Sequence, residues 1–70
     1  MNKVKQVFTF GFGQQYEGGY VVIYASSKAK CREKMFKEYG AKWSMQYNDE
    51  EQAGVDEWKL KLIKVFGTQN

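Results

Sequence analysis

The side chains that could carry out a reaction in this chain are few. The candidate nucleophiles are Cys31, Ser26, Ser27 and Ser44. The chain has no histidine, so none of them has the imidazole base that usually activates a nucleophile. General acid–base catalysis would need a carboxylate whose pKa is shifted by burial, yet five of the eight acidic residues fall in the polar segment 49–57. One cysteine without histidine also makes neither a disulfide nor a zinc site. We therefore expect no catalytic residue, no metal and no cofactor.

Cys31 itself admits two interpretations. Its neighbours Lys30 and Arg32 could lower the pKa of the thiol and make it reactive. The same cysteine falls on one stripe with Met35 and Tyr39 at the spacing of a helix, and free cysteine is among the residue types most often buried. The spacing favours a cysteine in the core.

The glycine-rich segment 11–19 resembles a phosphate-binding loop only superficially. It lacks the third glycine of a dinucleotide fingerprint and has no Gly-Lys-Ser/Thr, and it leads into a strand instead of a helix. Hairpin geometry is the simpler role for these glycines. The amides and ring at its tip, Gln14, Gln15 and Tyr16, nevertheless form a candidate contact surface for a ligand or partner.

A cluster of cations in the next segment is the second candidate. It consists of Lys28, Lys30, Arg32, Lys34, Lys37 and Lys42. We expect Lys30, Lys34 and Lys37 to share one helix face, with Arg32 on its flank, where they could contact phosphates. The alternative is a solvated helix face balanced by nearby glutamates. Because the net charge is only +3, any contact with nucleic acid would be local.

Aromatic residues make up 17% of the chain, more than one small core comfortably hides. On an amphipathic strand they usually belong to the core, although exposed rings could stack on bases or anchor a protein partner. We nominate Arg32 on the helix, with Lys42, Trp43 and Tyr47, as contact residues, while the pattern leaves open whether the two rings lie inside or outside.

The periodicity predicts the elements that position these residues. Strands are expected over residues 4–12, 20–25, 42–48 and 58–66, and a helix over residues 28–39. Ser26 or Ser27 would cap the helix and Gly40 would end it. The second strand is apolar on both faces and should lie centrally in the sheet. The acidic segment 49–57 reads as a loop or a short helical turn.

Strict alternation assigns the side chains of each strand to one face or the other. Phe8, Phe10 and Phe12 should share one face of the first strand, and Trp43, Met45 and Tyr47 should share one face of the third. In the last strand Trp58, Leu60 and Leu62 should point inward. The phase slips at Ile63, which indicates either a bulge or burial on both faces. The order β-β-α-β-β predicts an α+β fold with about four antiparallel or mixed strands and one helix on one face.

Size and composition bound the remaining expectations. The seventy residues are expected to form a single domain, 1–70. This is near the lower size at which a core is stable, so the core must be rich in apolar side chains or the chain must form a homo-oligomer. The polar N-terminus argues against secretion, and the lack of a long apolar run argues against membrane association. A lone cysteine fits the reducing cytoplasm.

Several short motifs occur along residues 7–63, at residues 10–14, 19–23, 31–36, 39–47 and 53–55, among them Phe-Gly-Phe-Gly-Gln and Tyr-Gly-Ala-Lys-Trp. Together they resemble a family of short uncharacterised proteins encoded by phages and prophages of Gram-positive bacteria. The resemblance supplies no activity and no site residues. It implies a context in which small phage proteins counter host immunity, either by blocking an effector or by sequestering its nucleotide signal.

The sequence therefore predicts a non-catalytic binding protein in the cytoplasm of a bacterial host. Its first expected role is that of a counter-defence factor that inhibits a host defence protein by direct binding. Two alternatives stay open. One is a sponge for a nucleotide immune signal, and the other is a small nucleic-acid-binding module that uses the basic helix.

Overall fold

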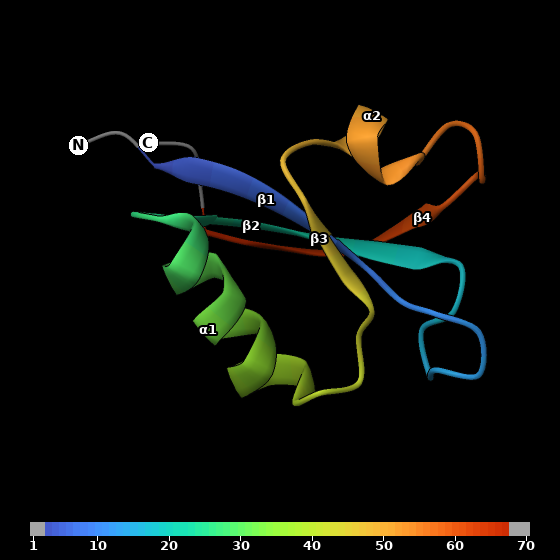
Figure 1. The fold of residues 1–70 in the computed structure, drawn as a ribbon, viewed down its shortest axis with the longest axis horizontal. Coiled ribbons are helices and arrows are strands. Elements are labelled where there is room, and N and C mark those ends of the chain that lie inside the picture. The colour runs from blue at the N-terminus through green and yellow to red at the C-terminus, as the bar shows by residue number, and fades with distance from the viewer. Residues whose placement is uncertain (1–2, 68–70) are drawn as a thin grey trace.

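A computed structural model describes residues 3–67 as a four-stranded mixed sheet with two helices (Figure 1). The elements in chain order are β1 (Val4–Thr9), β2 (Gly19–Ala25), α1 (Lys28–Tyr39), β3 (Met45–Tyr47), α2 (Glu50–Ala53) and β4 (Lys61–Phe66). The predicted α+β class is therefore confirmed. The element order differs from the predicted one because the acidic segment forms the short helix α2 between the last two strands.

The strands lie in the order β3-β1-β2-β4. β1 runs antiparallel to both β2 and β3, whereas β2 and β4 are parallel. The mixed sheet, one of the two predicted arrangements, is the correct one. The central position of β2 is also confirmed, because Val21 and Ile23 are buried on one face and Val22 on the other.

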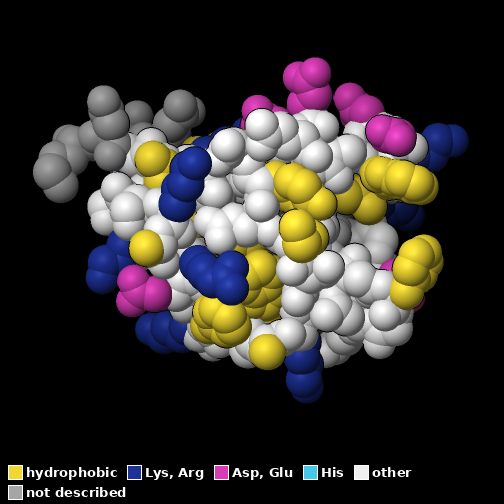
Figure 2. All heavy atoms as spheres, viewed as in Figure 1, with side chains coloured by type: hydrophobic (Ala, Val, Ile, Leu, Met, Phe, Trp, Pro, Cys, Tyr) yellow, Lys and Arg dark blue, Asp and Glu magenta, His cyan; other side chains and the backbone are white. Residues whose placement is uncertain are grey.

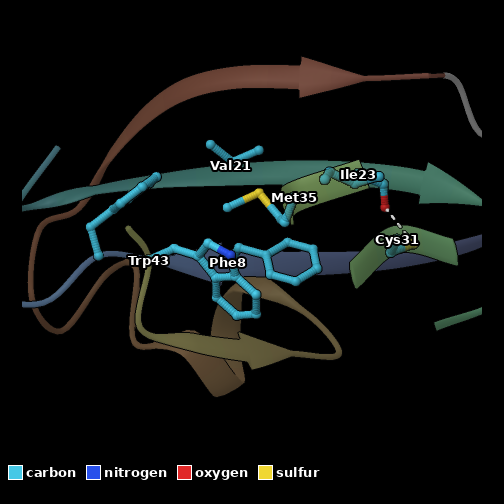
Figure 3. Packing of buried hydrophobic residues seen from close by; sticks show 7 residues of the cluster. Phe8, Val21, Ile23, Cys31, Met35 and Trp43 are labelled. Carbon is cyan, nitrogen blue, oxygen red and sulfur yellow. Dashed lines mark hydrogen bonds between the residues drawn. The ribbon is translucent and has the colours of Figure 1, made fainter. Parts of the chain in front are cut away.

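The larger core lies between α1 and the sheet (Figure 3). It holds the fully buried side chains of Phe8, Cys31 and Met35, and the Trp43 ring meets the Phe8 ring edge-on at 5.1 Å between centroids. Both predicted ends of α1 are confirmed. Ser27 accepts a hydrogen bond from the Lys30 amide at 3.1 Å, and Gly40 has a φ of 62°, a conformation that favours glycine.

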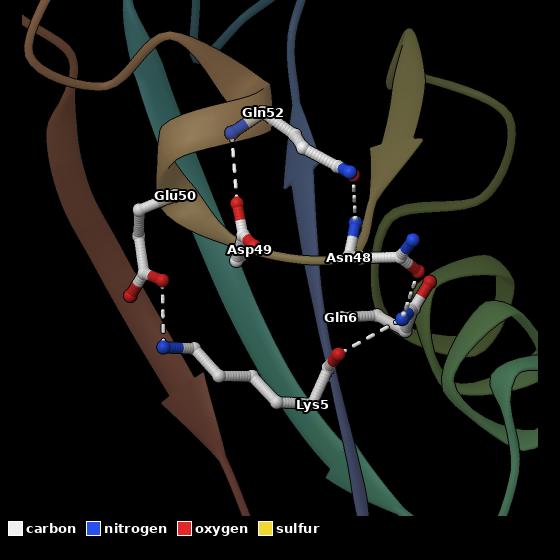
Figure 4. Close-up of polar contacts among 6 residues, drawn as sticks. All are labelled: Lys5, Gln6, Asn48, Asp49, Glu50 and Gln52. Atoms are coloured by element: carbon white, nitrogen blue, oxygen red, sulfur yellow. Dashed lines mark hydrogen bonds and ion pairs between the residues drawn. The ribbon is translucent and has the colours of Figure 1, made fainter.

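The opposite face of the sheet carries a smaller core under α2, where Val7, Val22 and Ala53 are buried. Asp49 caps α2 by accepting a hydrogen bond from the Gln52 amide at 2.8 Å. The Lys5 ammonium lies 2.6 Å from the Glu50 carboxylate and links β1 to this helix (Figure 4). Because α2 has only four residues, it covers this face in part.

The first strand is shorter than predicted. It ends at Thr9, and the chain turns where the Gln14 amide donates to the Gly11 carbonyl at 3.1 Å. This turn lifts Phe12 off the sheet, so its side chain is 95% exposed, and the prediction that it shares a strand face with Phe8 and Phe10 is wrong. Phe8 and Phe10 are buried.

The third strand has only three residues, and the prediction that Trp43, Met45 and Tyr47 share one face is wrong. Trp43 lies in the preceding loop, where its indole N–H donates to the Gly40 carbonyl at 3.0 Å and the ring packs against the core under α1. Tyr47 pairs with Val7 in the sheet and therefore lies on the α2 face. Trp43 and Tyr47 are thus on opposite sides of the sheet, and Met45 is 53% exposed.

The last strand begins at Lys61, three residues later than predicted. Trp58 lies in the loop before it and is 70% exposed, so its inward prediction is wrong. Leu62 lies opposite Tyr20, on the face that α2 covers only in part, and is also exposed. The predicted bulge is confirmed, because the pairing passes from Leu62 directly to Lys64 and leaves Ile63 as the additional residue.

Candidate protein-binding surface

One aromatic and cationic cluster at the edge of the larger core combines α1 with the loop that precedes β3. The guanidinium carbon of Arg32 lies 5.2 Å from the ring centroid of Phe36 and 5.0 Å from that of Trp43. The two rings meet edge-on at 5.3 Å, and Phe36 is 45% exposed. Within residues 3–67, no carboxylate forms an ion pair with Arg32. These three residues, the Arg32 cluster, place a stacked cation at the surface.

An open groove adjoins this cluster between α1 and β3. It has a volume of about 610 Å³, and its lining includes Lys28 and Arg32 but no carboxylate. The amides in the groove are already engaged. The Gln46 side chain donates to Gln6 at 2.9 Å. Gln6 in turn donates to Asn48 at 3.1 Å, as Figure 4 shows. The groove, called here the Arg32 groove, is therefore a preformed surface with positive charge.

The predicted phosphate-contacting lysines are mostly engaged with carboxylates. Lys30 lies 3.6 Å from Glu33, and Lys34 lies 2.9 Å from Glu38. Lys34 holds the pKa of the Glu38 carboxyl below its ordinary value. Lys37 alone of the three forms no ion pair among the described residues. This pairing favours the alternative of a charge-balanced, solvated helix face.

The hairpin tip is braced by the side chains that we nominated as contacts. The Gln14 side-chain oxygen accepts a hydrogen bond from the Gly11 amide, so this residue shapes the loop. The Tyr16 ring packs edge-on against Phe10 at 5.4 Å and Tyr39 at 5.5 Å. Gln14 and Tyr16 are therefore structural residues of the loop, whatever else they contact.

The structure brings part of the predicted site together and separates the rest. Gln15 and Tyr16 line one shallow pocket with Lys42, at the end of α1. Arg32 and Trp43 meet in the Arg32 cluster, whereas Tyr47 lies across the sheet. The seven nominated contact residues thus belong to three different surfaces. Sequence reasoning did not nominate Phe36 and missed its contact with Arg32.

Cys31 is a core residue, as its helical spacing predicted. Its side chain is fully buried, and the thiol donates to the Ile23 carbonyl across an Sγ–O distance of 3.4 Å. Burial raises the pKa of the Cys31 thiol above its ordinary value, so the unreactive protonated form is favoured. Residues 3–67 contain no group of three or more Cys, Asp or Glu side chains placed to hold a metal ion.

Comparison with known proteins yields no relative: no protein-family model, no curated protein and no solved structure matches the chain. In the part of the chain that the structure describes, no helix has the length and apolar character needed to cross a membrane. The chemistry of the surfaces is therefore the basis for a functional proposal.

Proposed function

We propose that this domain is a non-catalytic binding protein of phage or prophage origin that inhibits a host immune effector in the bacterial cytoplasm by docking onto it. The observation that carries the proposal is the stacking of Arg32 on Phe36 and Trp43 beside an open groove. Arginine and large aromatic residues dominate the binding energy of protein interfaces, particularly where they are held in place before binding. The counter-defence context rests on the family resemblance of the sequence.

The charge of the groove indicates the chemistry of the partner. Lys28 and Arg32 line it, and no carboxylate does, so an acidic surface fits best. A guanidinium that stacks by its face keeps its edge N–H donors available for a carboxylate. The cluster would then supply both an apolar contact and a bidentate ion pair at one position.

The test is capture of the effector from host lysate, followed by an activity assay with the purified effector. Arg32→Glu reverses the charge of the cluster and should abolish both capture and inhibition. Lys37→Glu is the matched control, since it makes the same charge change on α1 at a residue without ring contacts, and it should leave both intact. Equal behaviour of the two variants, or capture without inhibition by a stoichiometric amount of the protein, would contradict the proposal.

A nucleotide sponge remains the second candidate because the groove combines two cations with side-chain amides. Phosphates could bind Lys28 and Arg32, but Trp43 is only 8% exposed and offers little ring surface for a base. A sponge should gain about 2.7 kcal/mol of stability at a ligand concentration one hundred times the dissociation constant. Thermal unfolding with cyclic dinucleotides separates the candidates, since a docking protein should not respond to them.

A further inference from the structure

A second pocket lies at the end of the molecule formed by the hairpin loop and the loop before β4. Its volume is about 360 Å³, within the range of roughly 300–1,000 Å³ that is usual for ligand pockets. Phe10, Tyr47 and Leu60 line it, and the exposed rings of Phe12 and Trp58 contribute to its rim. We call it the apolar pocket.

Hydrogen bonds hold both walls of the apolar pocket in place. The Trp58 amide donates to the Gly54 carbonyl at 2.8 Å, and the Lys61 amide donates to the Gly18 carbonyl at 3.0 Å, which ties the two loops together. Gly54 has a φ of 75°, and a Cβ there would lie 2.6 Å from Cδ1 of the Trp58 indole. The indole therefore packs on the backbone at Gly54, while most of its surface stays exposed.

Negative charge lies at one side of this pocket. Among residues 3–67, three of the eight acidic residues, one in α2 and two in α1, form ion pairs. The other five are Glu17, Asp49, Glu51, Asp56 and Glu57, and Glu17 itself lines the pocket. Two lysines, Lys59 and Lys61, are near them in the chain, so carboxylates are in excess. Figure 2 shows acidic side chains along the edge formed by α2 and the following loop, beside exposed apolar ones.

We propose that the apolar pocket binds a cationic segment of a partner protein that inserts one bulky apolar side chain. The rings would bury this anchor, and lysine or arginine residues beside it would face the carboxylates of the rim. A second copy of this chain would bring two acidic rims together, and an anionic lipid surface would be repelled. The site is independent of the Arg32 groove, whose charge is opposite.

Trp58 provides the readout, because its ring is exposed whereas Trp43 is buried. The probe is a capped twelve-residue peptide of alternating leucine and lysine pairs, compared with the same peptide carrying glutamate for lysine and with oligolysine of equal length. The leucine–lysine peptide should bind saturably at 1:1 and shift the emission to shorter wavelength. The glutamate peptide should not bind. Oligolysine should bind at least about tenfold more weakly than the leucine–lysine peptide, since it lacks the apolar anchor.

Two variants locate the binding. Phe12→Ser should weaken the peptide about tenfold without unfolding the protein, because Phe12 is 95% exposed. Phe36→Ser removes an exposed ring from the Arg32 cluster and is the matched control, which should bind the peptide normally. Arg32→Glu should also bind it, so failure of the proposed effector docking and failure of this site are distinguishable.

Three results would overturn the proposal. Equal affinity of oligolysine and the leucine–lysine peptide would reveal a purely electrostatic contact. Unchanged binding by Phe12→Ser would place the peptide elsewhere. A dimer in sedimentation equilibrium, together with Trp58 emission that is already at short wavelength without peptide, would show that a second copy of the chain occupies the pocket.

Discussion

The stacking of Arg32 on two rings has a measurable consequence for stability. Arg32→Ala removes both cation–π contacts, each worth about 0.5–1 kcal/mol at an exposed site, so the free energy of unfolding should fall by about 1–2 kcal/mol. The better helix propensity of alanine returns at most a few tenths of a kcal/mol. A change of this size is readily measured by urea unfolding followed by circular dichroism, and it lowers the melting temperature of a small domain by roughly 4–8 °C per kcal/mol.

A double-mutant cycle isolates one contact. Combining Arg32→Ala with Phe36→Ala should give a coupling free energy of about 0.5–1 kcal/mol, which is the contact at 5.2 Å. Arg32→Gln keeps a planar group without the charge and should behave like Arg32→Ala. The control cycle pairs Lys37→Ala with Phe36→Ala and should be additive. A coupling of zero within error would mean that Arg32 is not held on the ring, and the proposed binding surface would lose its preorganisation.

Three further predictions follow from the packing. Gly19→Ala should lower the free energy of unfolding by about 1–3 kcal/mol, because the added methyl would collide with the Ile63 side chain. In an Ile63→Ala background, Gly19→Ala should lower the free energy of unfolding by less, when both are measured by urea unfolding. Cys31 should react with an aromatic disulfide reagent only as fast as the protein unfolds locally or globally, so urea should accelerate its modification. Rapid reaction of the native protein would contradict the burial of Cys31. Glu50 raises the pKa of Lys5 above its ordinary 10.5. The stabilisation by this pair is therefore present below pH 10.5 and is lost as the pH rises through the folded-state pKa. Lys5→Met should lower the melting temperature near neutral pH but progressively less above pH 10.5.

The features that could be predicted from the sequence are those fixed by neighbouring residues. Ser27 and Gly40 define the ends of α1 because capping depends on a few adjacent backbone groups. The apolar run of β2 indicates burial on both faces wherever its partners lie. The slip at Ile63 is visible because alternation itself breaks there. In each case the physical cause lies within a few residues of its effect.

The errors concern side chains whose burial depends on distant segments. Phe12 and Trp58 continue an alternation that a turn interrupts, and only the tertiary structure shows that the strand has already ended or not yet begun. Trp43 and Tyr47 have the spacing of one strand face, but the indole is drawn under α1 by its bond to Gly40. The contact of Trp43 with Arg32 follows from that displacement, so sequence reasoning nominated both residues without predicting that they meet.

The net charge of +3 conceals how the charges are arranged. The two charges of each ion pair, Lys5–Glu50, Lys30–Glu33 and Lys34–Glu38, neutralise each other. Among residues 3–67, the carboxylates outside these pairs lie in the hairpin loop and in residues 49–57. β3 separates the two candidate surfaces, because Gln46 lines the positive Arg32 groove and Tyr47 lines the acidic apolar pocket. Two surfaces of opposite charge on the two sides of one short strand should attract different partner segments. The two proposals together predict that the domain contacts an acidic and a basic region at the same time, and that variants at Arg32 and Phe12 remove these contacts independently.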